Sequence, residues 1–150
     1  MTGTLFSSVY DLFMTLQEDY RLTNLYNTSL TDFESYLEGW LIPAIAEFDT
    51  CDQVLTYSGT TFTETLTQVN MNMLADLMKK RWLEHEIDDI LQMNNFLQDK
   101  DFTRHSNAQG LDAKRKRYIE QKEEISQKLV NYGLRTTDWA TWYTGVYYVP

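Results

Sequence analysis

The apolar residues of this chain recur mostly at helical spacing. The first stripe consists of Phe6, Val9, Tyr10, Phe13, Leu16 and Tyr20. Steps of three and four residues place these side chains on one face of a helix, which we predict over residues 5–22, followed by a turn at residues 24–28. Thr31 precedes Glu34 by three residues, as in a capping box, so a second helix is predicted to begin there. Its apolar face continues to Phe48, and Pro43 inside it predicts a kink near Gly39.

The spacing changes to two between residues 53 and 64, where Val54, Thr56 and Ser58 alternate on one side of Gly59 and Thr60, Phe62 and Glu64 follow on the other. This threonine-rich segment predicts a short β-hairpin or an extended loop. An isolated two-stranded ribbon is marginally stable, so we expect it to lie on the helices or on a partner.

Two longer helical patterns follow. The third helix is predicted from residue 66 or 67 to residue 94, and its expected buried stripe is Val69, Met73, Leu74, Leu77, Met78, Trp82, Ile87, Ile90 and Leu91. The fourth is predicted over residues 106–132. Gly133 followed by Leu134 is typical of a helix that ends in a left-handed glycine.

These elements predict a mainly α protein, a bundle of about four helices, one of them long. A short hairpin or extended loop would separate the second and third helices. Residues 1–135 would form one helical domain with its hairpin near residues 53–64, and residues 136–150 an extended aromatic tail. The 150 residues are enough for one such domain with a real core.

Charge is unevenly distributed along the chain. The formal net charge is −9, yet residues 1–78 hold eleven acidic residues and a single basic one, Arg21. Such a surface disfavours a protein that coats nucleic acid, because phosphate binding needs clustered Lys and Arg. The single cysteine, Cys51, excludes an internal disulfide, and neither a signal peptide nor an apolar run of membrane-spanning length is visible. A cytoplasmic protein without membrane contact is expected.

Candidate chemistry is sparse. The segment from His85 through Glu86 to Asp89 begins like a zinc-protease motif but lacks the second histidine. Asp89 offers an oxygen ligand in principle, but a solvated helix face is the favoured interpretation. His105 and Ser106 are adjacent, so their side chains would point apart on a helix. We therefore predict no catalytic residue, no metal, no cofactor and no enzyme activity.

Two segments are candidates for contact with other molecules. Lys114, Arg115, Lys116 and Arg117 form a basic run that suits phosphate or an acidic partner, although four consecutive residues encircle a helix and nearby glutamates compensate them. The other segment is the tail, which has no helical pattern of its own. Its aromatic residues are Trp139, Trp142, Tyr143, Tyr147 and Tyr148. Large aromatic side chains supply much interface energy, so we predict a partner surface there.

The order of several short segments is distinctive. They are Tyr10-Asp11-Leu12-Phe13 with Asp19-Tyr20-Arg21-Leu22, then Phe33-Glu34-Ser35-Tyr36-Leu37, Cys51 before the hairpin, Leu74-Ala75-Asp76-Leu77-Met78 with Trp82, Asp101-Phe102-Thr103-Arg104-His105-Ser106, and Tyr132-Gly133-Leu134-Arg135. In this order the sequence resembles the small head-to-tail connector proteins, also called adaptor or head-completion proteins, of tailed bacteriophages that infect Gram-positive hosts. The likeness spans about residues 9–142. His105 departs from it, since an aromatic residue usually precedes the serine.

The resemblance implies a non-enzymatic virion protein of the neck, assembled in the host cytoplasm. Its subunits would form a ring, commonly of twelve copies, that joins the portal to the next neck or tail-completion protein around the DNA channel, without sequence-specific DNA binding. The expected partners are therefore the portal protein and neighbouring copies, with the aromatic tail docked on one of them. The acidic first half would face the channel. The alternative is a small cytoplasmic helical module that binds a host or regulatory protein and forms no ring.

Overall fold

The computed structural model describes residues 3–98 and 105–140. Within them the chain forms five helices and one two-stranded hairpin. The helices are α1 (Phe6–Leu16), α2 (Tyr20–Thr28), α3 (Leu30–Glu47), α4 (Gln68–Gln98) and α5 (His105–Thr136), and the strands are β1 (Tyr57–Ser58) and β2 (Thr61–Phe62). The predicted class, mainly helical with a short hairpin before the long third pattern, is confirmed. None of the helices in the described ranges is long and apolar enough to cross a bilayer.

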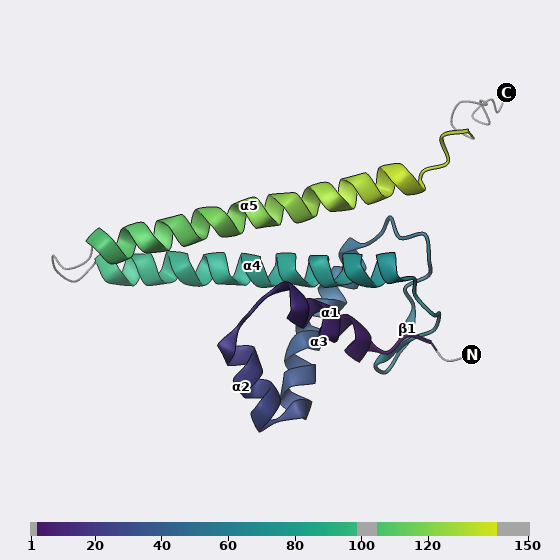
Figure 1. Cartoon of the computed structure of the whole chain (residues 1–150), viewed down its shortest axis with the longest axis horizontal. Coiled ribbons are helices and arrows are strands. Elements are labelled where there is room, and N and C mark those ends of the chain that lie inside the picture. The colour runs from purple at the N-terminus through teal and green to yellow at the C-terminus, as the bar shows by residue number, and fades with distance from the viewer. Residues whose placement is uncertain (1–2, 99–104, 141–150) are drawn as a thin grey trace.

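Helix α4 is the centre of the fold (Figure 1). α5 runs antiparallel along one side of α4, while α1 and α3 pack on the other side and α2 packs on α3. The core therefore lies mainly between α1, α3 and the first half of α4. Its completely buried side chains are Phe6, Val9, Phe13, Leu37, Leu41, Phe48, Phe62, Leu74, Leu77, Met78 and Leu83.

The single helix predicted over residues 5–22 is wrong, because the chain leaves the helical conformation between Leu16 and Tyr20. Gln17 is extended, and the carboxylate of Asp19 accepts a hydrogen bond from the backbone N–H of Arg21 at 2.9 Å, which makes Asp19 the N-cap of α2. An aspartate in this position satisfies a backbone donor that a continuing helix would not leave free. The buried part of the predicted stripe thus ends before the break, and its last two members, Leu16 and Tyr20, are 38% and 84% exposed.

The junction between α2 and α3 also differs from expectation. The predicted turn at residues 24–28 is helical, and α3 begins at Leu30 with Ser29 as its N-cap, whose hydroxyl accepts from the N–H of Asp32 at 3.3 Å. Thr31 is inside the helix, so the predicted capping box is wrong. Pro43 lies within α3.

The hairpin is short and is held by the start of the chain. Tyr57 pairs with Phe62 and Ser58 with Thr61, and Gly59 makes the turn with a φ of +58°, a conformation that favours glycine. On the other side of β2, Leu5 forms a bridge with Thr61, and the N–H of Phe62 donates to the carbonyl of Thr4 at 2.8 Å. The hairpin lies on α1, with the rings of Phe6 and Phe62 4.9 Å apart, as expected for a ribbon too small to stand alone.

Helix α5 passes through the position where we predicted its end. Gly133 is helical, Gly59 is the only glycine with positive φ in the described residues, and α5 ends at Thr136. Thr137 then donates its hydroxyl and its backbone N–H to the carbonyl of Gly133, at 2.6 and 3.1 Å. The side chain and backbone N–H of Thr137 therefore satisfy a carbonyl in the last turn of α5.

The stripe predicted on α4 is partly correct. Met73, Leu74, Leu77, Met78, Trp82 and Ile90 are buried, whereas Val69 and Leu91 are 50% and 37% exposed. Since α4 is covered on two sides, Ala75, Leu83 and Glu86 are buried as well.

Candidate functional site

The aromatic tail is described only at its start. Trp139 lies just after α5, is 45% exposed, and donates from its indole Nε1 to the carbonyl of Leu134 at 3.0 Å. Trp142, Tyr143, Tyr147 and Tyr148 lie outside the described residues. Trp139, the one tail aromatic among the described residues, therefore contacts the end of α5 while nearly half of its surface stays exposed to solvent.

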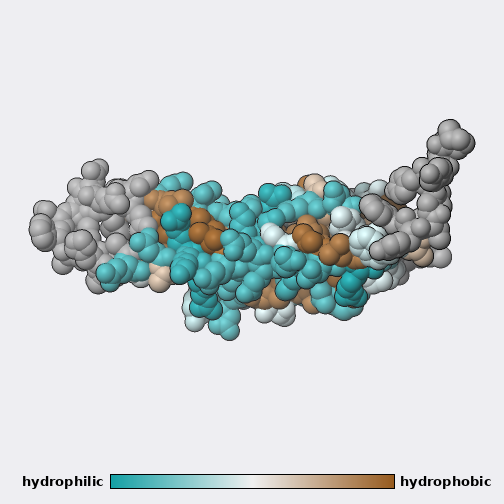
Figure 2. Space-filling model, turned by 90° about the horizontal axis from the view of Figure 1, so that it is seen from above, coloured by the Kyte–Doolittle hydropathy of each residue, from teal (hydrophilic) through white to brown (hydrophobic). Residues whose placement is uncertain are grey.

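The outer face of α5 also exposes apolar side chains near the tail. Val130 and Leu134, one helical turn apart, are 54% and 50% exposed. The space-filling view of this side shows two brown apolar areas within a mainly hydrophilic surface (Figure 2). Because α5 packs on α4 and on no other element to a comparable extent, its outer face is not covered by the rest of the described chain.

The basic run on α5 is divided by the helix. The ammonium of Lys114 lies 5.4 Å from the centre of the Tyr118 ring, one turn further along α5. Lys114, Lys116 and Arg117 are exposed, and Arg115 is partly buried. Lys122 and Lys128 further along α5 pair with Glu84 and Asp76 of α4, each at 3.2 Å. The run therefore does not form one basic face, and part of the positive charge of α5 holds the two long helices together.

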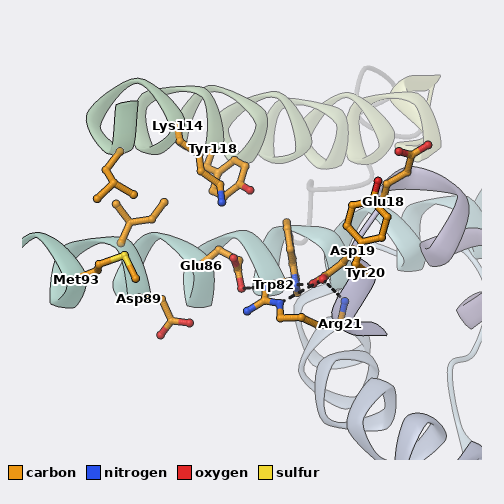
Figure 3. A pocket seen from close by; sticks show the side chains of 12 residues that line it. Glu18, Asp19, Tyr20, Arg21, Trp82, Glu86, Asp89, Met93, Lys114 and Tyr118 are labelled. Carbon is orange, nitrogen blue, oxygen red and sulfur yellow. Dashed lines mark hydrogen bonds and ion pairs between the residues drawn. The ribbon is translucent and has the colours of Figure 1, made fainter. Parts of the chain in front are cut away.

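A pocket of about 450 Å³ lies between the start of α2, the middle of α4 and the first half of α5. Figure 3 shows Lys114 and Tyr118 reaching toward it from α5 and Arg21 entering it from α2. Trp82 and Ile90 line it from α4. The rings of Trp82 and Tyr118 are 5.8 Å apart, so its wall is aromatic and its rim is charged.

Arg21, the only basic residue in the acidic half of the chain, is at the centre of this pocket. Its Nε and Nη2 donate to the two carboxylate oxygens of Asp19 at 3.2 and 3.1 Å, and Nη2 also donates to Oε1 of Glu86 at 2.7 Å. The hydrogen bonds from Arg21 to Asp19, and secondly to Glu86, raise the pKa of the guanidinium above its usual value. The arrangement ties α2 to α4 through a glutamate that is only 9% exposed.

Beside this ion pair, the structure brings together three groups suited to bind a metal ion. One ligand atom each of His85, Glu86 and Asp89 lies within 4.8 Å of the other two. Nδ1 of His85 is 3.6 Å from Oδ2 of Asp89 and 3.8 Å from Oε1 of Glu86. The expected solvated face is correct for His85, Asp88 and Asp89, which are exposed, and wrong for Glu86, which is buried.

The burial of Glu86 could have been predicted from the apolar spacing of α4, although its likeness to a zinc-protease motif did not indicate it. Glu86 is four residues after Trp82 and four before Ile90, so it occupies the buried stripe of α4. A carboxylate in such a position is almost never buried without a partner. Because residues 1–78 contain only one basic side chain, Arg21 was the natural candidate for that partner on the other side of the core.

A second polar cluster joins the loop between α3 and β1 to α4 and α5. The hydroxyl of Tyr132 is 2.7 Å from Oδ1 of Asp52 and 2.7 Å from Oδ1 of Asn70, and it accepts from the N–H of Asp52 at 3.1 Å. Hydrogen bonds from Asn70 and Tyr132 lower the pKa of Asp52, whereas burial raises the pKa values of Tyr132 and Cys51. A thiol with a raised pKa is a weak nucleophile. The cluster joins residues of the loop after α3, α4 and α5 by hydrogen bonds.

Comparisons with known proteins identify no relative. No family model matches the chain, no curated protein is significantly similar in sequence, and no solved structure is significantly similar in fold.

Proposed function

We propose that this protein is a virion structural subunit, a component of a neck ring that joins the portal of a tailed bacteriophage to the next neck or tail component around the DNA channel. The observation that carries the proposal is the placement of α5. This helix of 32 residues packs on α4, exposes Val130 and Leu134 on its outer face, and leads into the aromatic tail. Apolar side chains on an uncovered face next to an aromatic segment are typical of a surface that binds another chain.

The elongated pair formed by α4 and α5 supports the same proposal. A ring needs a heterologous interface, in which one face of a subunit meets a different face of the next. The subunit presents two such faces. One is the outer face of α5, and the other is the layer of α1 and α3 on the opposite side of α4 (Figure 1). The uneven charge adds a difference between them, because residues 1–78 contribute the acidic excess.

We place the contact with the portal or with a neighbouring subunit at the aromatic tail, through Trp139, Trp142, Tyr143, Tyr147 and Tyr148. The basic run Lys114–Arg117 is a second contact, in which Lys114, Lys116 and Arg117 are exposed. In this arrangement the acidic first half faces the channel, where repulsion keeps DNA from adhering as it passes.

The test is assembly of the full chain with portal-bearing heads, followed by a mass measurement of the complex. A neck subunit joins in a stoichiometric ring, and deletion of residues 136–150 abolishes the joining. A separate variant, Lys116→Gln with Arg117→Gln, leaves the tail intact and tests the basic run as the second contact. A full chain that never joins the heads would contradict the neck function and favour the small helical binding module. Unchanged joining after the deletion would contradict only the role of the tail.

A further inference from the structure

We propose that His85, Glu86 and Asp89 form a binding site for a divalent transition metal ion of the zinc type. The site is independent of the neck function and lies beside the pocket between α2, α4 and α5. Its three ligand atoms are already within 4.8 Å of one another. Two ligands of one zinc ion, each about 2.1 Å from it, are about 3.4 Å apart in tetrahedral geometry. The separations from His85 Nδ1 of 3.6 Å to Asp89 and 3.8 Å to Glu86 are close to that value, so small side-chain movements complete the site.

The helix itself sets this arrangement. His85 and Asp89 are four residues apart on α4, so their side chains lie one above the other on the same face. Glu86 projects toward the pocket, where it is buried, and its longer side chain reaches back to the other two (Figure 3 labels Glu86 and Asp89). The site thus requires no movement of one element against another.

The donor set selects the kind of ion. One imidazole nitrogen with two carboxylates suits zinc and its first-row neighbours, whereas magnesium and calcium prefer oxygen ligands alone. Nδ1 of His85 lies beyond hydrogen-bond distance of both carboxylates, so in the tautomer with its proton on Nε2 it has a lone pair for the ion. The edge of the His85 ring packs against Trp40, with ring centres 5.5 Å apart, which restricts its orientation.

Arg21 does not block the site. A carboxylate oxygen has two lone pairs, and Arg21 uses one of those on Oε1 of Glu86. The guanidinium is itself neutralised by Asp19, through two hydrogen bonds at 3.2 and 3.1 Å. Arg21 therefore acts as an outer partner that fixes the rotamer of a metal-binding glutamate, a role such partners commonly have around metal ions.

Access and remaining coordination come from solvent. The side chains of His85 and Asp89 are 48% and 49% exposed, so an ion reaches the cluster directly from water. Glu86 and Asp89 also line the pocket, which has room for water molecules that complete the coordination. Three protein ligands with an open position are the usual arrangement of zinc sites that are not purely structural.

The experiment is calorimetric titration of the full chain with Zn²⁺, in a Cys51→Ser background, because Cys51 is the only thiol. We expect one ion per chain. Each of His85→Ala and Asp89→Asn weakens binding at least tenfold. The matched controls are Asp88→Asn, which removes the adjacent exposed carboxylate, and His105→Ala, which removes the second histidine; both leave the affinity unchanged. Circular dichroism confirms that each variant is folded.

A second readout locates the ion. Cu²⁺ quenches nearby indole fluorescence, so Cu²⁺ bound at this site quenches Trp40, which packs on His85, and Trp82, which lines the adjoining pocket, and His85→Ala removes this quenching. Absence of Zn²⁺ binding to the parent chain, or equal binding after His85→Ala, overturns the proposal. Neither result bears on the assembly of the chain with portal-bearing heads.

Discussion

The hydroxyl of Tyr132, near the end of α5, lies 2.7 Å from the carboxylate oxygen Oδ1 of Asp52, in the loop that follows α3. This contact joins residues 80 positions apart in the sequence. With Asn70 of α4, it connects three parts of the fold at one point. The packing of α5 on the rest of the protein therefore depends on a polar cluster as well as on apolar contacts.

Replacing Tyr132 by Phe removes the hydroxyl and keeps the ring against Phe48, whose centre is 4.9 Å away. Asp52 and the buried Asn70 then lose a hydrogen-bond partner, which costs about 1–3 kcal/mol of unfolding free energy. Urea denaturation measures this loss. Tyr118→Phe is the matched control, because the contacts of Tyr118 with Trp82 and Lys114 are made by its ring, and we expect it to be nearly neutral.

The same cluster makes stability depend on acidity. Hydrogen bonds to Asn70 and Tyr132 lower the pKa of Asp52 in the folded state below its value in the unfolded chain. A lowered carboxyl pKa contributes stability that is present above the unfolded pKa and is lost as pH falls through the folded pKa. Asp52→Asn is therefore expected to destabilise the protein at pH 7 and to have less effect near pH 2. An unchanged gap between the two proteins across this range, in denaturation curves at several pH values, would contradict the assignment.

Alanine substitution is expected to destabilise the protein at Gly3 and to stabilise it at Gly133. A Cβ on Gly3 would lie 1.7 Å from the carbonyl oxygen of Phe62, a backbone atom that cannot move aside without disturbing the hairpin. Gly133 is inside α5, and a Cβ there would be 3.6 Å from the methyl of Thr50, an ordinary contact. Gly133→Ala is thus expected to stabilise the protein by up to about 1 kcal/mol through helix propensity. A destabilised Gly133→Ala would restore the helix end predicted at this residue.

Arg21→Gln removes the cation that pairs with Glu86. The side chain of Glu86 is 9% exposed and would lose its ionic partner on α2. Because Arg21 itself is 66% exposed, we expect a moderate loss of about 1–2 kcal/mol in thermal or urea denaturation. Lys116→Gln, which removes an exposed positive charge from α5, is the control and should change stability by less than about 0.5 kcal/mol. Equal effects of the two substitutions would show that net charge, and not the pairing with Glu86, determines the loss.

The spacing of apolar residues predicted the helices that bury a single face. It did not predict where helices end, because capping hydrogen bonds determine those positions. The stripe from Phe6 to Phe13 is buried as expected, and so are most positions of the stripe of α3, although its Tyr36 is 39% exposed. The ends of helices depended on single hydrogen bonds of Asp19, Ser29 and Thr137, which apolar spacing does not register. The helix expected over residues 5–22 was for this reason two helices.

The pocket was harder to predict than the fold because the residues that line it come from separate elements. Arg21 and Glu86 are 65 residues apart, and only the folded chain brings them within 2.7 Å. The basic run follows the prediction that four consecutive residues encircle a helix. Lys114 lines the pocket, whereas Lys116, two residues further, lies on another side of α5.

The antiparallel pairing of α4 and α5 also has a consequence for how the chain folds. Contacts between α4 and α5 close longer loops the further they lie from the connection between the two helices. Asp76 and Lys128 are 52 positions apart in the sequence, and Asn70 and Tyr132 are 62 positions apart. The entropy cost of closing a loop grows with its length, and each contact already formed shortens the loop that the next one must close. We therefore expect the two helices to join in order from their connected ends, with the polar cluster at Tyr132 forming last and fixing the end of α5 on the domain.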